Sequence, residues 1–158
     1  MSEETLNKVF ADPSTFERKY PEQRLQVSHR TDDSFQKGGF YRNYVLYRDL
    51  KLTPETGHLI DVHVLKPIWP CTDVNRKPHF HDSQLFLAYI LKGWMKIVFE
   101  GHGEHLMQEG SAWNQSGVKH QVIDFSEDCE LMEICMPANF DTLNVKFNAL
   151  SETLGVHP

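Results

Sequence analysis

The fold is decided by two adjoining stretches, Pro78-His79-Phe80-His81 and Leu85-Phe86-Leu87-Ala88-Tyr89-Ile90-Leu91, the second ending in a turn at Lys92-Gly93. Side chains of a strand alternate between its two faces, so the two histidines point the same way only if their segment is extended. The second stretch is apolar throughout and rich in strand-forming residues, which predicts a strand buried on both faces. Imidazole is a ligand that suits zinc, iron, copper and nickel, and a third imidazole is available at His120.

Further short segments show strand-like alternation between turn signals. They are residues 40–50, 58–66, 94–100, 105–108, 112–114, 120–125 and 130–136, and a strand with a helical turn is expected within residues 140–154. Turns containing glycine, proline or acidic residues separate them, and residues 67–78 form a long loop with three prolines. Short strands at this spacing, with almost no convincing helix, predict an all-β sandwich or barrel.

The chain divides into an N-terminal arm, residues 1–37, and a β-barrel domain, residues 38–158. Its 158 residues suffice for one domain with a sizeable core. In the arm, Pro13 and Pro21 interrupt the helical pattern, and residues 28–37 are polar. We expect the arm to pack on the outside of the domain or on a neighbouring subunit, or else to be a partly disordered terminus.

The composition limits the classes of partner. The formal net charge of -6 argues against nucleic acid and anionic membrane surfaces as partners. No apolar run reaches transmembrane length, and the acidic start lacks the features of a signal peptide. The odd count of three cysteines, without a Cys-x-x-Cys, favours free thiols in the cytoplasm. The sequence also lacks a P-loop, a GxGxxG and a GxSxG nucleophile elbow.

Five residues carry a resemblance to a known family: His79, His81, Gly93, Gly110 and His120. Their order resembles the two motifs of the cupin superfamily, especially of its small single-domain members. The resemblance covers about half of the chain, from Val62 to Pro137. It implies a double-stranded β-helix, or jelly roll, with a metal ion held inside the barrel. The carried-over ligands are the three histidines.

The sequence departs from the family pattern in both motifs. Phe86 stands where the first motif has a glutamate ligand, and the nearest oxygen donor on the same face is Gln84. The second motif is one residue shorter than the pattern, with Ser116 in place of proline and Asp124 in place of asparagine. The resemblance therefore implies three histidine ligands and no fourth ligand.

Three neutral imidazoles leave a divalent ion with its full charge and with open coordination positions. The missing glutamate predicts a stronger Lewis acid that binds less tightly. The ring of Phe86 would lower the local dielectric and favour a partly apolar organic ligand. The expected cofactor is a divalent transition metal, namely iron, nickel, manganese or zinc.

Three further residues are candidates for the pocket. Gln84 is either a fourth ligand or metal-site hydrogen-bond donor, or a solvated strand start. His63, in the middle of an apolar strand, is either a satisfied core histidine or a pocket residue. Glu133 lies between Met132 and Ile134, so it is either a buried carboxylate that serves as a base or an outward-pointing side chain.

The leading hypothesis is a metal-dependent enzyme of the dioxygenase, lyase or isomerase type, acting on a small organic substrate with an oxygen donor. The alternative is a non-catalytic small-molecule-binding or sensor protein with a degenerate metal site. A sugar epimerase or isomerase is a third and weaker possibility. We expect a homodimer, because exposed strand edges in small barrels are often covered by dimerisation. The candidate interface elements are Phe10, Phe16 and residues 40–50.

Overall fold

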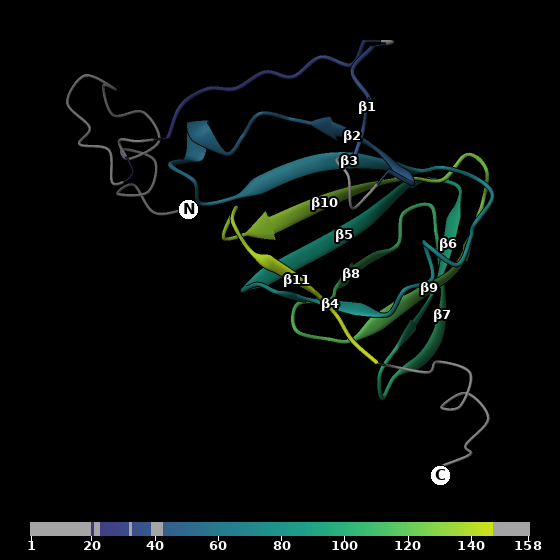
Figure 1. Cartoon of the computed structure of the whole chain (residues 1–158). Coiled ribbons are helices and arrows are strands. Elements are labelled where there is room, and N and C mark those ends of the chain that lie inside the picture. Colours follow the sequence, from purple (N-terminus) through teal and green to yellow (C-terminus); the bar gives the residue numbers. More distant parts are fainter. Residues whose placement is uncertain (1–19, 21–22, 32, 39–42, 147–158) are drawn as a thin grey trace, which may run out of the picture.

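The computed structural model describes residues 20, 23–31, 33–38 and 43–146. Within these ranges the chain forms two β-sheets that face each other and one short 3-10 helix, η1 (Pro54–Thr56) (Figure 1). The strands are β1 (Gln36–Lys37), β2 (Val45–Asp49), β3 (Asp61–Pro67), β4 (His79–Asp82), β5 (Leu85–Lys92), β6 (Trp94–Phe99), β7 (Gly103–Gln108), β8 (Ala112–Asn114), β9 (His120–Phe125), β10 (Glu130–Met136) and β11 (Asp141–Asn144).

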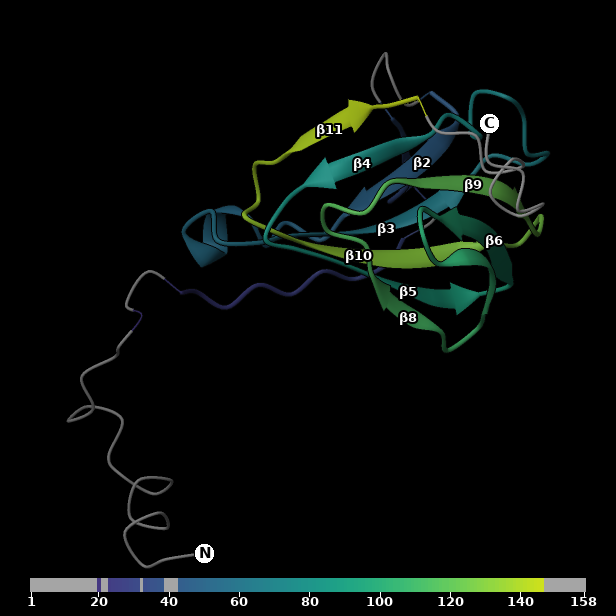
Figure 2. The same ribbon diagram turned by 90° about the horizontal axis from the view of Figure 1, so that it is seen from below.

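One sheet has six strands in the order β1-β2-β3-β10-β5-β8, and the other has five in the order β11-β4-β9-β6-β7. The paired strands are antiparallel, and many are distant in sequence, such as β3 with β10 and β4 with β11. Figure 2 shows the barrel from the side on which β11, β4 and β9 lie next to one another. The all-β jelly-roll architecture predicted from the sequence is confirmed. No helix in the described part of the chain is long and apolar enough to cross a membrane.

The predicted strands agree with the observed ones most closely at β8, β9 and β10. Two short elements, β1 and η1, fall in stretches expected to be loop. The end of the strand and helical turn expected in residues 140–154 lies outside the described residues, as do residues 40–42 of the first expected strand and the interface candidates Phe10 and Phe16.

The expectation that the apolar stretch 85–91 is buried on both faces is wrong. Phe86, Ala88 and Ile90 point inward and are fully buried, whereas Tyr89 and Leu91 on the other face are each 38% exposed. Uniform apolarity gives no information about which face is covered. Here β5 lies next to β8, the short edge strand of its sheet, and Tyr89 and Leu91 are on its more exposed outer face.

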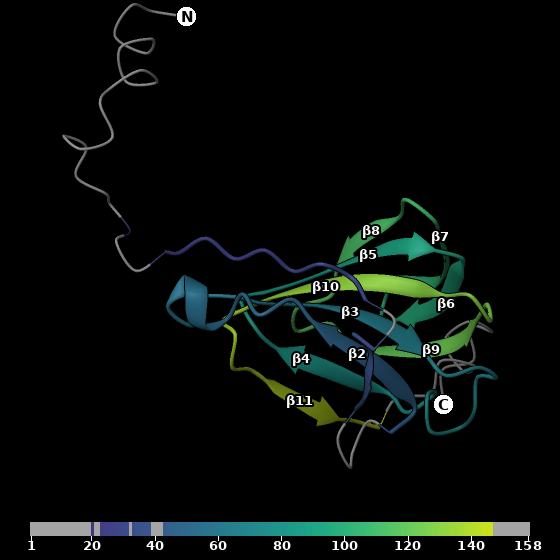
Figure 3. The same ribbon diagram turned by 90° about the horizontal axis from the view of Figure 1, so that it is seen from above.

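Strand β3 is instead buried on both faces. Leu65 points into the barrel, while Val62 and Val64 point outward and are still only 4% and 5% exposed. The described residues 23–31 and 33–35 run along the outside of this sheet, over β3 and β10 (Figure 3), which is the face to which Val62 and Val64 point. Arg30 Nη1 binds Glu130 Oε1 of β10 at 3.0 Å. This part of the arm therefore packs on the barrel.

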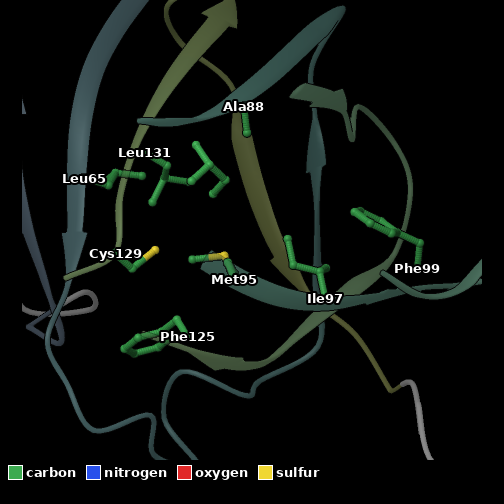
Figure 4. Packing of buried hydrophobic residues seen from close by; sticks show 9 residues of the cluster. Leu65, Ala88, Met95, Ile97, Phe99, Phe125, Cys129 and Leu131 are labelled. Carbon is green, nitrogen blue, oxygen red and sulfur yellow. The ribbon is translucent and has the colours of Figure 1, made fainter. Parts of the chain in front are cut away.

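The apolar core lies between the two sheets (Figure 4). Met95 and Ile97 of β6 and Phe125 of β9 pack against Leu65, Ala88, Ile90 and Leu131 of the six-stranded sheet. Several of these side chains also line an internal cavity, so the core forms part of the cavity wall. Burial of this cluster thus fixes the spacing of the sheets that carry the polar residues of the site.

Gly93 is the single residue that connects β5 to β6 in a tight turn. Its φ is 71°, in the left-handed region, and a Cβ there would overlap Ser126 Oγ and lie 2.7 Å from Asp128 Oδ1. Gly101 has a similar φ of 75°, but a Cβ there would meet nothing within 4 Å. The two glycines therefore separate the cost of backbone conformation from the cost of close packing.

We predict that Gly93→Ala destabilises the protein more than Gly101→Ala does. The backbone term costs roughly 1–2 kcal/mol in both variants, and the overlap at Gly93 adds about 1–3 kcal/mol. Urea unfolding of both variants measures the difference. Equal losses of unfolding free energy would show that the Ser126 and Asp128 side chains move aside at no cost.

Candidate metal centre

Three histidines that are distant in sequence meet inside the barrel. His79 and His81 alternate on β4, and His120 is the first residue of β9, where it is the direct register partner of His79. The ring centroids are 4.4 Å apart for His79 and His120, 5.1 Å for His79 and His81, and 5.2 Å for His81 and His120. One ligand nitrogen from each ring lies within 4.8 Å of the others. The extended conformation inferred from the His-x-His spacing produces this convergence.

The Nδ1 atom of each imidazole has a hydrogen-bonding partner. Nδ1–H of His79 donates to the carbonyl oxygen of Lys77 at 2.9 Å, and that of His120 donates to the carbonyl oxygen of Val118 at 2.8 Å. Nδ1 of His81 shares a hydrogen bond of 2.9 Å with Thr142 Oγ1 on β11. A proton held on Nδ1 leaves Nε2 with a lone pair, which is the arrangement typical of metal-binding histidines.

The histidines differ in burial, and this affects their protonation. His81 and His120 are each 2% exposed, whereas His79 is half-buried. Burial, together with the nearby His79, lowers the pKa of His120 to about 4, although its bond to the Val118 carbonyl acts in the opposite direction. His120 is therefore a neutral imidazole near pH 7, as a metal ligand must be.

Phe86, at the position of the motif glutamate, lies directly against one ligand. Its ring stacks on that of His81 with centroids 3.9 Å apart and an interplanar angle of 14°. The ring of Phe140 contacts both edge-on, at 5.8 Å from His81 and 5.4 Å from Phe86. Phe86, which stands in place of a glutamate, thus supplies a flat apolar surface that fixes the plane of the His81 imidazole.

The three histidines open into a cavity of about 430 Å³. Apolar side chains of the core and Trp113 form much of its wall. Tyr47, Gln115 and Glu133 also line the cavity, and Gln115 Oε1 accepts a hydrogen bond of 2.8 Å from the Trp113 indole. The volume lies in the range typical of small-molecule sites.

The other two predicted pocket residues that lie on strands are His63 and Glu133. They are direct register partners across β3 and β10. Nε2 of His63 lies 2.9 Å from Glu133 Oε2, and Nδ1 lies 3.0 Å from Asp61 Oδ2. Burial alone would lower the pKa of His63, but the hydrogen bonds and charges of Asp61 and Glu133 outweigh it and raise the pKa to about 9. The group is therefore a buried imidazolium between two carboxylates.

The structure separates the predicted site residues into two sets. His79, His81 and His120 form a histidine cluster that could hold a metal ion, and His63 and Glu133 form a pair of which Glu133 lines the same cavity. Gln84 is exposed at the start of β5, does not line the cavity, and donates its backbone N–H to the Met136 carbonyl at 2.8 Å.

Sequence reasoning missed Asp61, Thr142 and the cavity position of Trp113. The Asp-x-His spacing of Asp61 and His63 was a usable signal, because residues two apart share a face of a strand. Thr142 gave no signal, since its role depends on the pairing of β11 with β4.

The donor set fits a divalent transition metal. Imidazole nitrogen suits zinc, iron, nickel and copper, and the burial and Nδ1 bonds described above keep the lone pairs available. The residues that would hold the ion are His79, His81 and His120, with Lys77, Val118 and Thr142 orienting their rings.

The sequence matches no protein-family model and no curated protein. Solved structures do match. RemF, a polyketide cyclase from Streptomyces resistomycificus, is 18% identical, with 79% of this chain and 88% of RemF aligned at a TM-score of 0.60. Pac13 from Streptomyces, a nucleoside dehydratase, is 11% identical, with 80% of this chain and 98% of Pac13 aligned at a TM-score of 0.54.

The Fe(II) form of HppE is 15% identical, with 70% of this chain and 60% of HppE aligned at a TM-score of 0.53. These matches and the two facing sheets indicate the same fold. The chain has the cupin fold. At these identities the likeness extends to the cupin fold alone.

The hydrogen bond between His81 Nδ1 and Thr142 Oγ1 leads to a test of how the barrel orients the histidines. We predict that Thr142→Val weakens the binding of zinc by about 10- to 100-fold, because second-shell partners of metal-binding histidines contribute this much. Competition with a chromophoric chelator measures the affinity. Thr31→Val, on the exposed arm, is the matched control; equal affinities of the two variants would contradict an orienting role of Thr142.

The raised pKa of His63 predicts a pH dependence of stability. The folded state holds this proton more tightly than the unfolded state, whose pKa is near 6.5, so the stabilisation is full below pH 6.5 and is lost as the pH rises through about 9. The unfolding free energy should fall by roughly 1 kcal/mol per pH unit across this window. Urea unfolding of wild type and His63→Gln tests it: the variant should lack this part of the slope.

Proposed function

We propose that this protein is a metal-dependent enzyme that binds a small organic substrate through an oxygen donor. The observation that carries the proposal is the set of three buried or half-buried imidazoles, each with its Nδ1 engaged, at the wall of a cavity of about 430 Å³. Building such a cluster costs stability, because each ring must be desolvated and given a partner. A cavity-facing metal centre is a functional reason for that cost.

A bound divalent ion would supply a positive charge and open positions at which a carbonyl, carboxylate or enolate oxygen is held and polarised. The chain's own residues do the rest. Phe86 keeps the plane of His81 fixed, and the apolar walls exclude water from the ligand body. With three neutral ligands and no carboxylate among them, the site favours an anionic or strongly polar oxygen donor.

We favour dioxygenase, lyase or isomerase chemistry, since each begins with an oxygen donor held at a metal. Cupin-fold proteins that resemble this chain include a polyketide cyclase and a nucleoside dehydratase, as well as HppE in an Fe(II) form. They support a metal-binding enzyme on this fold, and the choice of iron, nickel, manganese or zinc belongs to the same proposal.

The second candidate is a non-catalytic binding or sensor protein. The observation in its favour is Phe86, which replaces a ligand of the family motif with an apolar ring. In that case the cavity would take up a ligand without changing it.

The first experiment is elemental analysis of the purified protein and of His79→Ala/His81→Ala. We expect close to one transition-metal ion per chain in the wild type and almost none in the variant. His102→Ala/His105→Ala, which removes an exposed pair on the β6–β7 hairpin, is the control and should keep its metal. A wild type that takes up no metal, even after refolding with each ion, would favour the binding protein.

The same metal-loaded samples are then screened with diketones, phenols and hydroxy acids, with and without oxygen. Turnover by the wild type and by the His102→Ala/His105→Ala control, with loss in His79→Ala/His81→Ala, is the expected result. Tight binding of a compound that is recovered unchanged under every condition would favour the binding protein instead.

A further inference from the structure

The cavity wall carries a carboxylate besides the histidine cluster. Glu133 comes from β10, in the sheet opposite to the strands of the histidines, and it lines the same cavity. Among the described residues, His63 is the only hydrogen-bonding partner of the Glu133 side chain, and the bond uses Oε2. No fully enclosed side-chain oxygen in the described part of the chain is without a partner, so Oε1 is in contact with the cavity space.

The Glu133 carboxylate is held firmly in place. His63 binds it from the neighbouring strand and is bound in turn by Asp61, which accepts a hydrogen bond of 3.1 Å from Thr53 Oγ1. Asp49, the register partner of His63 on β2, is a further charged residue on the neighbouring strand and is paired with Lys51. The raised pKa of His63 agrees with a cation lodged among carboxylates. Such an anchored carboxylate presents Oε1 in a fixed direction.

The wall of this cavity is mixed. Met95, Ile97, Phe125 and Leu131 line it with apolar surface, together with the rings of Tyr47 and Trp113, and the polar side chains of Asn75, Lys77, Gln115 and Asn144 line it as well. A ligand that fills this space therefore combines a flat or aliphatic body of modest size with several polar atoms. A carboxylate oxygen accepts hydrogen bonds, so it selects a hydroxyl group over a second carbonyl or an ether.

We propose that Glu133 is a specificity-determining residue that accepts a hydrogen bond from a hydroxyl group of the ligand, while the histidine-bound metal takes an oxygen donor of the same molecule. His63 is a positioning residue that acts through Glu133. The inference rests on the proposed metal site and names the substrate class: a small hydroxylated aromatic or enolic carbonyl compound with a second hydroxyl group distant from the first.

The test compares two probes on two proteins. The first probe is ortho-hydroxyacetophenone, whose adjacent carbonyl and hydroxyl oxygens chelate a metal. The second is the same compound with one more hydroxyl group, used as each of its ring isomers. Dissociation constants are measured by calorimetry on zinc-loaded wild type and on zinc-loaded Glu133→Gln, a nearly isosteric change that replaces the acceptor with an amide.

We expect the wild type to bind at least one dihydroxy isomer about tenfold or more tightly than the monohydroxy probe, as a hydrogen bond to a charged group predicts. Glu133→Gln should lose this preference and keep its affinity for the monohydroxy probe. His63→Gln should reduce the preference without weakening the monohydroxy probe. Glu127→Gln, on an exposed turn, is the control and should behave as the wild type.

An equal preference in wild type and Glu133→Gln would overturn the proposal, and so would failure of every dihydroxy isomer to bind more tightly. A failure of the metal site is distinguished separately, because zinc content is measured on each sample and binding of the monohydroxy probe must vanish in His79→Ala/His81→Ala.

A measurement on the wild type keeps the test independent of whether the Glu133 and His63 variants fold. With isotope-labelled histidine, the preferred dihydroxy isomer should shift the Nε2 resonance of His63, and the monohydroxy probe should leave it in place. A His63 resonance that responds equally to both probes would contradict a hydroxyl group at Glu133.

Discussion

Among the described residues, four histidines lie buried or half-buried in the barrel, and each is held by a hydrogen bond at Nδ1. The rest of the site depends on that constraint. A buried ring nitrogen without a partner costs more free energy than a single bond returns, so the fold must supply an acceptor at each position. For His79 and His120 the acceptor is a backbone carbonyl two residues earlier, on the same chain segment. His81 instead requires a separate strand, β11, to bring Thr142 to it. The assembly of the site is thereby tied to closure of the five-stranded sheet.

The same rule separates the buried histidines into two electrostatic classes. Where the partner is a backbone carbonyl, as for His120, burial favours the neutral ring and lowers the pKa. Where the partners are carboxylates, as for His63, the ring becomes an imidazolium. The barrel therefore contains a neutral imidazole on one sheet and an imidazolium between carboxylates on the other.

Local patterns in the sequence were sufficient for the fold and for the histidine cluster. The His-x-His spacing fixes two rings on one face of a strand, and the family motif adds His120. What could not be predicted depends on non-local register. Glu133 meets His63 because β10 pairs with β3 in one particular alignment, and a shift of one residue would send Glu133 to the opposite face. Apolarity alone also gave a wrong prediction. It indicated burial of both faces for β5, whereas β3 is buried on both faces although it contains a histidine.

The described residues before β1 bind to the outside of the barrel in the way that a covalently attached peptide would. This segment is held to the six-stranded sheet by Arg30 at Glu130, by Arg48 reaching the carbonyl of Ser28, and by the ring of Phe35 against the Lys66 ammonium. Gln23 and Arg24 also donate hydrogen bonds to the carbonyl oxygens of Thr56 and Glu55. All of these contacts are local, so detachment of the segment requires less free energy than global unfolding. Detachment would open the outer face of β3, on which Val62 and Val64 lie, next to the strand positions of His63 and Asp61. The rate of amide hydrogen exchange in β3 would then depend on how often the segment detaches. Attachment of the segment to the outer face of β3 would thereby affect the order of His63 and Asp61 on the inner face.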